Sequence, residues 1–171
     1  DLIQGSFDLA LRNSALPDSS LKGRKLADDL RILCASPDYL SQHGMPAHPE
    51  ELATHQMIAF KEQSPIPLAG RDGKAGQFNP RQAGCRLIVD DGLSQKIATI
   101  AGAGISMNSL WSVHRELADG SLVRVLTDYR VDDHTALWLV YPKSNVLTAK
   151  VRIFIDFLLE KIGNAPVWAG A

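Results

Sequence analysis

The stretch that most constrains the fold is residues 86–111, RLIVDDGLSQKIATIAGAGISMNSLW. Residues 87–89 form a short continuous apolar run, which is typical of a strand covered on both faces. Asp90 and Asp91 follow the run and offer side-chain oxygens to the free N–H groups of a helix start. The next apolar residues have the i, i+4, i+7, i+8 spacing of a helix with one buried face: Leu93, Ile97, Ile100 and Ala101.

Two glycines then end the predicted helix. Gly102 and Gly104 accept the left-handed turn that closes a helix, and residues 105–107 can return to the sheet as a second strand. The stretch therefore predicts a βαβ unit whose helix begins at the carboxyl end of a strand. Proteins of the α/β class often bind ligands at such a position.

Composition places the chain among ordinary globular proteins. Its 171 residues are 45% hydrophobic and 22% charged, enough to bury a core as one domain or two small lobes. A formal net charge of -1 provides no basic face for nucleic acid. The chain opens in mid-pattern at Asp1 without a methionine, so we expect it to be a piece of a longer protein.

Cys34 and Cys85 are too few for a disulfide scaffold and match no metal-ligand spacing, which suits a reducing compartment. Buried unreactive thiols are one interpretation, and a redox pair is the other. No apolar run approaches the roughly 20 residues of a membrane span, and no signal peptide opens the chain. We therefore expect a cytoplasmic protein without a membrane partner.

The remaining pattern alternates strands and helices. Residues 21–29 show no clear period, residues 61–84 suit either a loose hairpin or a surface loop, and residues 128–135 are a polar linker. The expected strands are 7–11, 30–35, 57–60, 122–126 and 136–141. The expected helices begin after Ser36, at Pro49, at Leu110 and after Thr148; the last has the apolar stripe Val151, Phe154, Ile155, Leu158 and Ile162.

No pattern for catalysis, metal or cofactor binding emerges. The five histidines never occur at i, i+4 on one helix or at a metalloenzyme spacing, and there is no GxSxG nucleophile elbow. Gly102 and Gly104 follow their helix instead of opening it, so they cannot place N–H groups at a pyrophosphate. We expect no enzyme, no metal and no cofactor.

Small polar residues do follow several predicted strands. If these strand ends face one crevice, their neutral donors and helix starts suit a small molecule, including an anionic one. The candidate effector-binding residues are Asn13, Ser14, Ser36, Asp91, Gly92, Asn108 and Ser109.

An ordered series of blocks from residue 1 to about 163 closely resembles the effector-binding domain of LysR-type transcriptional regulators. Two positions depart from the usual pattern of that family: Ser109 stands where a proline is common, and Leu68 where a tryptophan is common. In that family a winged helix-turn-helix, a linker helix and the first strand, helix and strand of the effector domain precede the position that matches Asp1, so we expect these parts to be missing from this piece. The matching blocks are DLIxGxFDLALR (1–12), LCASPxYL (33–40), AHPEEL (47–52), AGAGI (101–105), YP (141–142) and KVRxFIDFL (150–158).

The resemblance implies a two-lobed α/β fold similar to type 2 periplasmic-binding proteins, with a hinge that the chain crosses twice. We place the crossings near Ala35 and Ala136. Lobe one is then 1–35 with 136–163, lobe two is 36–135, and 164–171 is a tail. In the family, a small effector in the cleft between the lobes biases their geometry and signals to the DNA-binding domains.

The resemblance also implies a homodimer or homotetramer that contacts DNA only through the absent domain. The outer side of the helix at residues 92–100, with Gln95, Lys96 and Thr99, then either meets a partner subunit or faces solvent. The alternative function is a periplasmic solute-binding protein of a transporter, which shares the two lobes but requires an export signal.

Overall fold

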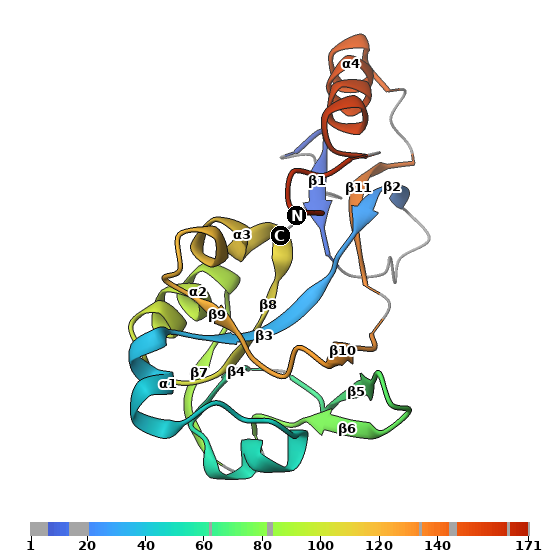
Figure 1. Cartoon of the computed structure of the whole chain (residues 1–171). Coiled ribbons are helices and arrows are strands. Elements are labelled where there is room, and N and C mark those ends of the chain that lie inside the picture. Colours follow the sequence, from blue (N-terminus) through green and yellow to red (C-terminus); the bar gives the residue numbers. More distant parts are fainter. Residues whose placement is uncertain are drawn as a thin grey trace. The chain divides into compact units, whose positions relative to one another are not determined.

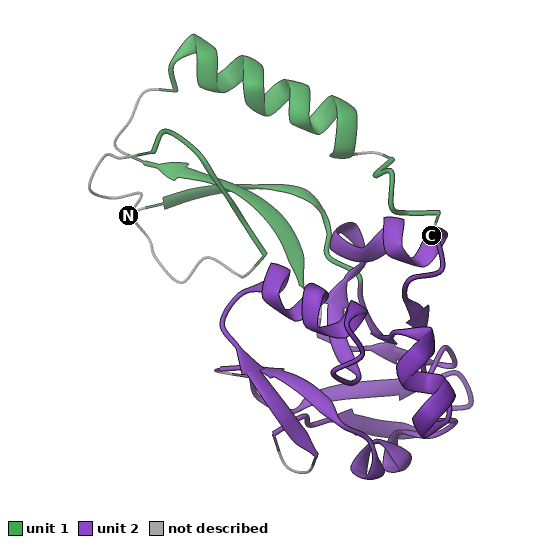
Figure 2. Ribbon diagram, turned by 90° about the vertical axis from the view of Figure 1, so that its left-hand side faces the viewer, with its two compact units in different colours: residues 1–30, 134–170 green, residues 31–133, 171 purple. Residues whose placement is uncertain are grey.

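The computed structural model describes residues 7–13, 21–61, 63–81, 84–133, 135–143, 147–163 and 165–170. The chain forms two compact units (Figure 2): residues 1–30 with 134–170 in unit 1, and residues 31–133 in unit 2. The predicted lobe boundaries, at Ala35 and Ala136, lie a few residues further along the chain. The strand that follows the first crossing therefore lies in unit 2, whereas the sequence placed it in lobe one.

Unit 1 is built on a three-stranded antiparallel sheet in the order β1-β11-β2. Its elements are β1 (Ala10–Arg12), β2 (Leu21–Asp28), β11 (Ala136–Pro142), α4 (Ala149–Leu158) and a π-helical turn (Leu159–Gly163). The predicted first strand is thus shifted toward its carboxyl end, and β11 is confirmed.

Strand β2 was not predicted, and a bulge explains why. The register against β11 shifts at Leu137/Trp138, so that Leu26 and Ala27, which are adjacent in the sequence, are both buried. A bulge interrupts the period-two alternation by which a strand is read from sequence.

The last helix is shorter and less buried than its stripe predicted. Of the five apolar positions only Val151 and Ile155 are buried, whereas Phe154 is 51% exposed. Thr148 is at the N-cap position, but its side chain makes no capping hydrogen bond. In the predicted tail, residues 165–170 form turns and Trp168 is buried.

Unit 2 contains the predicted βαβ unit inside a mixed sheet. Its strands are β3 (Arg31–Ala35), β4 (Met57–Phe60), β5 (Ile66–Gly70), β6 (Ala75–Phe78), β7 (Cys85–Val89), β8 (Ser106–Ser109), β9 (Val123–Arg124) and β10 (Tyr129–Val131). Its helices are α1 (Pro37–His43), the 3-10 helix η1 (Pro49–Thr54), α2 (Gly92–Ile100) and α3 (Leu110–Ala118). Figure 1 shows α2 and α3 next to β8.

The strands of the main sheet lie in the order β7-β4-β8-β3-β9. Strand β4 is parallel to β7 and also pairs with the chain entering β8, through a parallel bridge between Met57 and Ile105. Strand β3 is antiparallel to β8 and to β9. The βαβ crossover from β7 to β8 therefore passes over β4.

Strand β7 is at the edge of this sheet and pairs with β4. The prediction that other layers cover both of its faces is wrong, because two of its apolar side chains are exposed. Leu87 is 37% exposed and Ile88 is 50% exposed. A continuous apolar run in the sequence does not by itself show whether a helix or a second sheet covers the strand. In unit 2 these side chains of β7 are left exposed.

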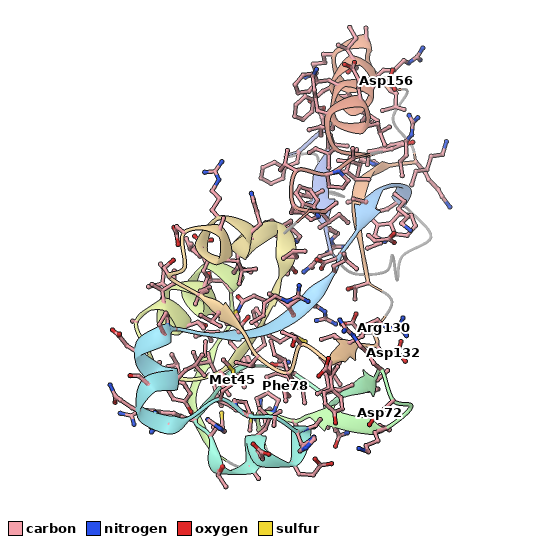
Figure 3. The ribbon with its side chains drawn as sticks, viewed as in Figure 1. Met45, Asp72, Phe78, Arg130, Asp132 and Asp156 are labelled. Carbon is pink, nitrogen blue, oxygen red and sulfur yellow. The ribbon has the colours of Figure 1, made fainter. Side chains whose placement is uncertain are left out.

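A smaller sheet, β10-β5-β6, packs on the main sheet through a common apolar core. The hairpin β5–β6 confirms one of the two interpretations of residues 61–84, and β10 lies within the predicted polar linker. Phe78 on β6 (Figure 3) is completely buried. The other buried members of this core are Leu33, Ala35, Tyr39, Leu52, Met57, Leu68, Ile105, Met107, Val125 and Leu126.

Two predicted turns are confirmed by their backbone. Ser36 caps α1, accepting a hydrogen bond from the N–H of Tyr39 at 3.2 Å, and Gly44 ends that helix with φ of 84°. Gly102 and Gly104 follow α2 with φ of 80° and 148°. A Cβ on Gly104 would lie 2.4 Å from the carbonyl oxygen of Gln56.

We predict that Gly104→Ala destabilises the chain by about 2 kcal/mol or more, because the new Cβ adds a clash to an unfavourable φ. Gly120→Ala is the matched control, since Gly120 also has a positive φ, of 80°, but has no atom within 4 Å of the added Cβ. The control should lose about 1 kcal/mol, from backbone strain alone. Urea unfolding of both variants measures the difference, and equal losses would contradict the prediction.

A cluster of the buried Tyr39 and His55 with the exposed His43 joins α1 to the start of β4. The hydroxyl of Tyr39 is 3.1 Å from Nδ1 of His55 and accepts a hydrogen bond from the N–H of Gln56 at 2.8 Å. The ring of His43 stacks on Tyr39 with centroids 4.3 Å apart. Burial, together with the nearby His43, lowers the pKa of His55 below its usual 6.5, while Glu51 acts in the opposite direction.

We predict that His55 makes the chain less stable in mild acid. Because its pKa is lower in the folded than in the unfolded state, the unfolded state binds the proton first as pH falls below about 6.5. The free energy of unfolding should therefore fall more steeply between pH 7 and pH 5 in the parent than in His55→Gln. Urea unfolding across this range tests it, with both proteins compared at pH 8, where His55 is neutral in both states; parallel profiles would refute it.

Candidate functional site

The carboxyl ends of several strands meet at one edge of the main sheet in unit 2, which we call the carboxyl edge. The parallel strands β4, β7 and β8 end there, and the N–H of Lys61 donates to the carbonyl of Val89 at 2.9 Å. Arg31, at the start of β3, pairs in register with Ser109, at the end of β8. The carboxyl edge therefore brings together Arg31, Lys61, Asp91, Gly92 and Ser109.

Asp91 and Gly92 form the start of α2 at this edge. The carboxylate of Asp91 accepts a hydrogen bond from the N–H of Ser94 at 2.8 Å, as predicted for a helix cap. The hydrogen bonds from Ser94 lower the pKa of Asp91, so the group is charged at neutral pH. Gly92 is exposed, and a Cβ added to it would have no atom within 4 Å.

Ser109 occupies the N-cap position of α3, but its side chain does not cap that helix. Free N–H groups in the first turn of a helix attract anions. The start of α3 therefore suits an anionic group better than the start of α2, which a carboxylate already caps.

Three cations that the structure describes at the carboxyl edge, Lys61, Arg31 and Arg81, were not among the predicted residues; Arg81 donates a hydrogen bond to the carbonyl of Lys61. Lys61 is exposed directly after β4, and Arg31 forms an ion pair with Asp133. Lys61 follows a predicted strand, so the same search for strand ends should have included it. Arg31 begins its strand, and only the antiparallel register with β8 brings it to this edge.

Ser36 does not lie at the carboxyl edge. It follows β3, whose antiparallel register places Cys34 beside Ser106 at the opposite end of β8. A Cβ on Gly102, beyond the end of α2, would lie 3.5 Å from the Ser36 hydroxyl. The structure thus places Ser36 at the far edge of the sheet, where it caps α1.

Asn108 is near the carboxyl edge, but its side chain is buried between the sheet and α2. Its amide donates to the hydroxyl of Ser106 at 2.6 Å and to the sulfur of Cys34 at 3.4 Å. The Ser106 hydroxyl is in turn 2.6 Å from that of Thr99, which donates to the carbonyl of Gln95 at 2.7 Å. We call these five residues the polar seam.

The polar seam corrects the predicted orientation of α2. Leu93 is 62% and Ile97 57% exposed, whereas Gln95 is 1% and Thr99 0% exposed. The apolar stripe therefore faces outward and the polar residues face the sheet. Neither interpretation of the outer side holds for Gln95 and Thr99, because both are buried.

Lys96 attaches α2 to α3. Its ammonium group donates to Glu116 at 2.8 Å and to the carbonyl of Ser112 at 3.1 Å. Burial is the largest single influence and raises the pKa of Glu116, but the hydrogen bond from Lys96, a backbone hydrogen bond and the charge of Lys96 together outweigh it, so the pKa lies below its usual value.

Asn13 is exposed in unit 1, directly after β1, and Ser14 lies outside the described residues. Their part in a site stays a prediction.

The two cysteines do not form a redox pair within the sheet. Cys34 is on β3 and Cys85 on β7, with β8 and β4 between them, so three strand spacings of about 4.8 Å separate them. A disulfide needs Cα atoms about 4.4 to 6.8 Å apart. Burial raises the pKa of the Cys34 thiol to about 11, which makes it a poor nucleophile.

Within the described residues, no group of three His, Cys, Asp or Glu side chains is arranged to hold a metal ion. In that same part of the chain, no helix has both the length and the apolar character needed to cross a bilayer.

Residues 1–163 match the family model described as the LysR substrate binding domain. The chain is 34% identical over 164 residues to the HTH-type transcriptional regulator CrgA of Neisseria meningitidis, covering 96% of this chain and 54% of that protein. It is 34% identical over 161 residues to the HTH-type transcriptional regulator DmlR of Escherichia coli, covering 94% and 52%. The chain therefore spans about half the length of the curated relatives it matches.

Solved structures agree with the sequence matches. The regulatory domain of CrgA, a LysR-type transcriptional regulator from Neisseria meningitidis, aligns with a TM-score of 0.80 at 31% identity, over 93% of this chain and 77% of that one. The full-length virulence activator AphB of Vibrio cholerae aligns with a TM-score of 0.76 at 31% identity, over 94% and 53%. The expected α/β fold of the two-lobed, periplasmic-binding-protein-like type is confirmed by these neighbours.

Proposed function

The chain belongs to the LysR substrate-binding domain family, and we propose that it senses a small-molecule effector for the DNA-binding part of the same regulator. The matched relatives are transcriptional regulators and not enzymes. They support a regulatory effector-binding domain and not the alternative, a transporter's solute-binding protein. We also propose a cytoplasmic location, because a transcriptional regulator acts where the DNA is.

The observation that carries the effector proposal is the carboxyl edge of unit 2. There, the starts of α2 and α3 lie at the same edge as Lys61, Arg81 and the ion pair between Arg31 and Asp133. We propose that Asp91, Gly92 and Ser109 contact the effector and that Lys61 contributes a positive charge. An anionic group of the effector would be accepted by the first turn of α3.

Ser36 and the side chain of Asn108 are not carried into this site, because one caps α1 at the far edge and the other belongs to the polar seam. Asn13 and Ser14 remain the predicted contributions of unit 1. An effector shifts a regulator only as far as it binds one arrangement better than another. A coupling of about 1 to 3 kcal/mol is typical of such systems.

We further propose that the chain self-associates through an apolar surface of unit 2. This surface, the α2 face, consists of Leu87, Leu93, Ile97 and Ile100, all more than a third exposed. Apolar patches of this kind mark interaction sites.

A second copy of the chain is the partner that fits the α2 face best. The exposed residues of α2 carry no charge, and its single charged residue, Lys96, is held by Glu116. An uncharged face pairs with its own copy about a two-fold axis without like-charge repulsion. A homodimer is therefore proposed, and the expected homotetramer stays a prediction.

The effector site is tested by a thermal-shift screen of carboxylic acids, amino acids and sugars. A ligand at 100 times its Kd stabilises the folded state by about 2.7 kcal/mol. Gly92→Leu should abolish the shift given by a hit, because the added side chain extends into open space at the carboxyl edge without disturbing the fold. Gln42→Leu, on the exposed side of α1, is the control and should keep the shift. A full shift in Gly92→Leu would place the effector elsewhere.

The interface is tested by Ile97→Ser, which replaces an apolar residue in the middle of the α2 face. We expect the dissociation constant of the dimer, measured by analytical ultracentrifugation, to rise at least tenfold, because about 1.5 to 3 kcal/mol of apolar burial is lost per side chain. Ile153→Ser makes the same change at a residue of α4 that is 69% exposed, and should leave it unchanged. A chain that is monomeric, or a dimer that tolerates Ile97→Ser, would rule out this interface.

A further inference from the structure

Helix α2 is turned with its apolar stripe away from the sheet, and this orientation needs a physical cause. At about 100° per residue, Leu93, Ile97 and Ile100 share one face of the helix, and Gln95 and Thr99 lie roughly opposite. Hydrophobic burial alone would turn the stripe toward the sheet. Some other interaction therefore sets the rotation of the helix.

The sheet surface beneath α2 provides that interaction. Ser106 and Asn108 of β8 present a hydroxyl and an amide to the helix, and both side chains are buried. Thr99 meets the Ser106 hydroxyl at 2.6 Å, and Asn108 donates to the same hydroxyl at 2.6 Å. If the stripe faced the sheet, the Ser106 hydroxyl would lose its hydrogen bond to Thr99, and the buried Ser106–Asn108 pair would lie against hydrocarbon, which is unfavourable.

The side chains of Gln95 and Lys96 also bear on the orientation of α2. Gln95 is buried, yet its side-chain nitrogen has no hydrogen-bond partner among the described residues. A helix packed only for stability would carry an apolar residue there, so the polar seam does not maximise stability. Lys96, on the side of the helix, is held by Glu116 and by the carbonyl of Ser112. The seam and the ion pair together fix the rotation of α2 from two directions.

We propose that Ser106 and Asn108 are positioning residues for self-association: by holding α2 with its polar side inward, they present the α2 face to a second copy. This inference rests on the proposed homodimer. It adds that the interface is set by residues that do not contact the partner, beneath the helix that does.

The test replaces the polar surface of β8 in the double variant Ser106→Ala, Asn108→Leu. The apolar surface of the variant sheet offers Gln95 and Thr99 no polar partner, so α2 should turn with its apolar stripe toward the sheet. We expect a folded chain with unchanged or raised Tm and a dimer dissociation constant at least tenfold higher. At a chain concentration well below the dimer dissociation constant of the parent, so that no partner covers residue 93, a Leu93→Cys probe in a Cys85→Ser background should react with a thiol reagent at least tenfold more slowly in the double variant than in the parent.

A quadruple variant, in which the inner side of α2 is made apolar like the sheet beneath it, provides the control. Adding Gln95→Leu and Thr99→Val to the double variant makes both sides of the seam apolar, so α2 regains its orientation and the dimer constant should return to within threefold of the parent. If the double variant does not fold, Thr99→Val alone decides, and it should weaken the dimer at least threefold without lowering Tm.

The outcomes separate this inference from the interface itself. If Ile97→Ser weakens the dimer but the folded double variant dimerises like the parent with a fully reactive probe, the positioning role is overturned and the interface stands. If neither variant weakens the dimer, the proposed interface fails, and this inference fails with it.

Discussion

The order of the strands in unit 2 depends on the backbone pairing between Ile105 and β4. The N–H of Ile105 donates to the carbonyl of Gln56 at 2.9 Å, and the N–H of Ile58 donates to the carbonyl of Ile105 at 3.0 Å. These two bonds join the β4-β7 pair to the strands β8, β3 and β9. They require a close approach at Gly104 that no other residue allows without a clash. The parallel direction they impose carries the ends of β4, β7 and β8 to one edge, where the proposed effector site lies.

The same sheet has two differently used faces. One is apolar and packs against the hairpin β5–β6 and α1, which gives unit 2 its core. The other carries the polar seam and supports α2. The hydrogen bond between Thr99 and Ser106 joins the polar side of the helix to the sheet, so apolar side chains remain on the outside of the helix, where a globular protein would normally place charge. The core of unit 2 and the proposed self-association thus depend on opposite faces of one sheet.

Most of the local conformations that a single residue type decides could be predicted from the sequence, although Thr148 does not make its predicted capping hydrogen bond. Ser36 and Asp91 are side-chain caps and Gly44, Gly102 and Gly104 end their helices, as predicted, because hydrogen bonding and steric freedom act over a few residues. Contacts between residues far apart in the sequence could not be predicted. The bulge in β2 hides its alternation, and β10 is a strand only because β5 pairs with it. The stripe on α2 faces outward although its spacing predicts a buried face. For the candidate site, Asp91, Gly92 and Ser109 were found as residues after strands, while Arg31 was not.

The sequence by itself determined the α/β class, most helix and turn boundaries, and membership of a regulator family, through blocks of residues that each act locally. Only the tertiary structure decided which strand ends share an edge and which face of α2 is buried. The direction of β3 moves Ser36 away from Asp91 and Ser109, and the hydroxyl and amide of β8 turn Gln95 and Thr99 inward. Both outcomes depend on partners distant in the sequence, and hydrophobic periodicity contains no information about the chemistry of the surface that a helix or strand will meet.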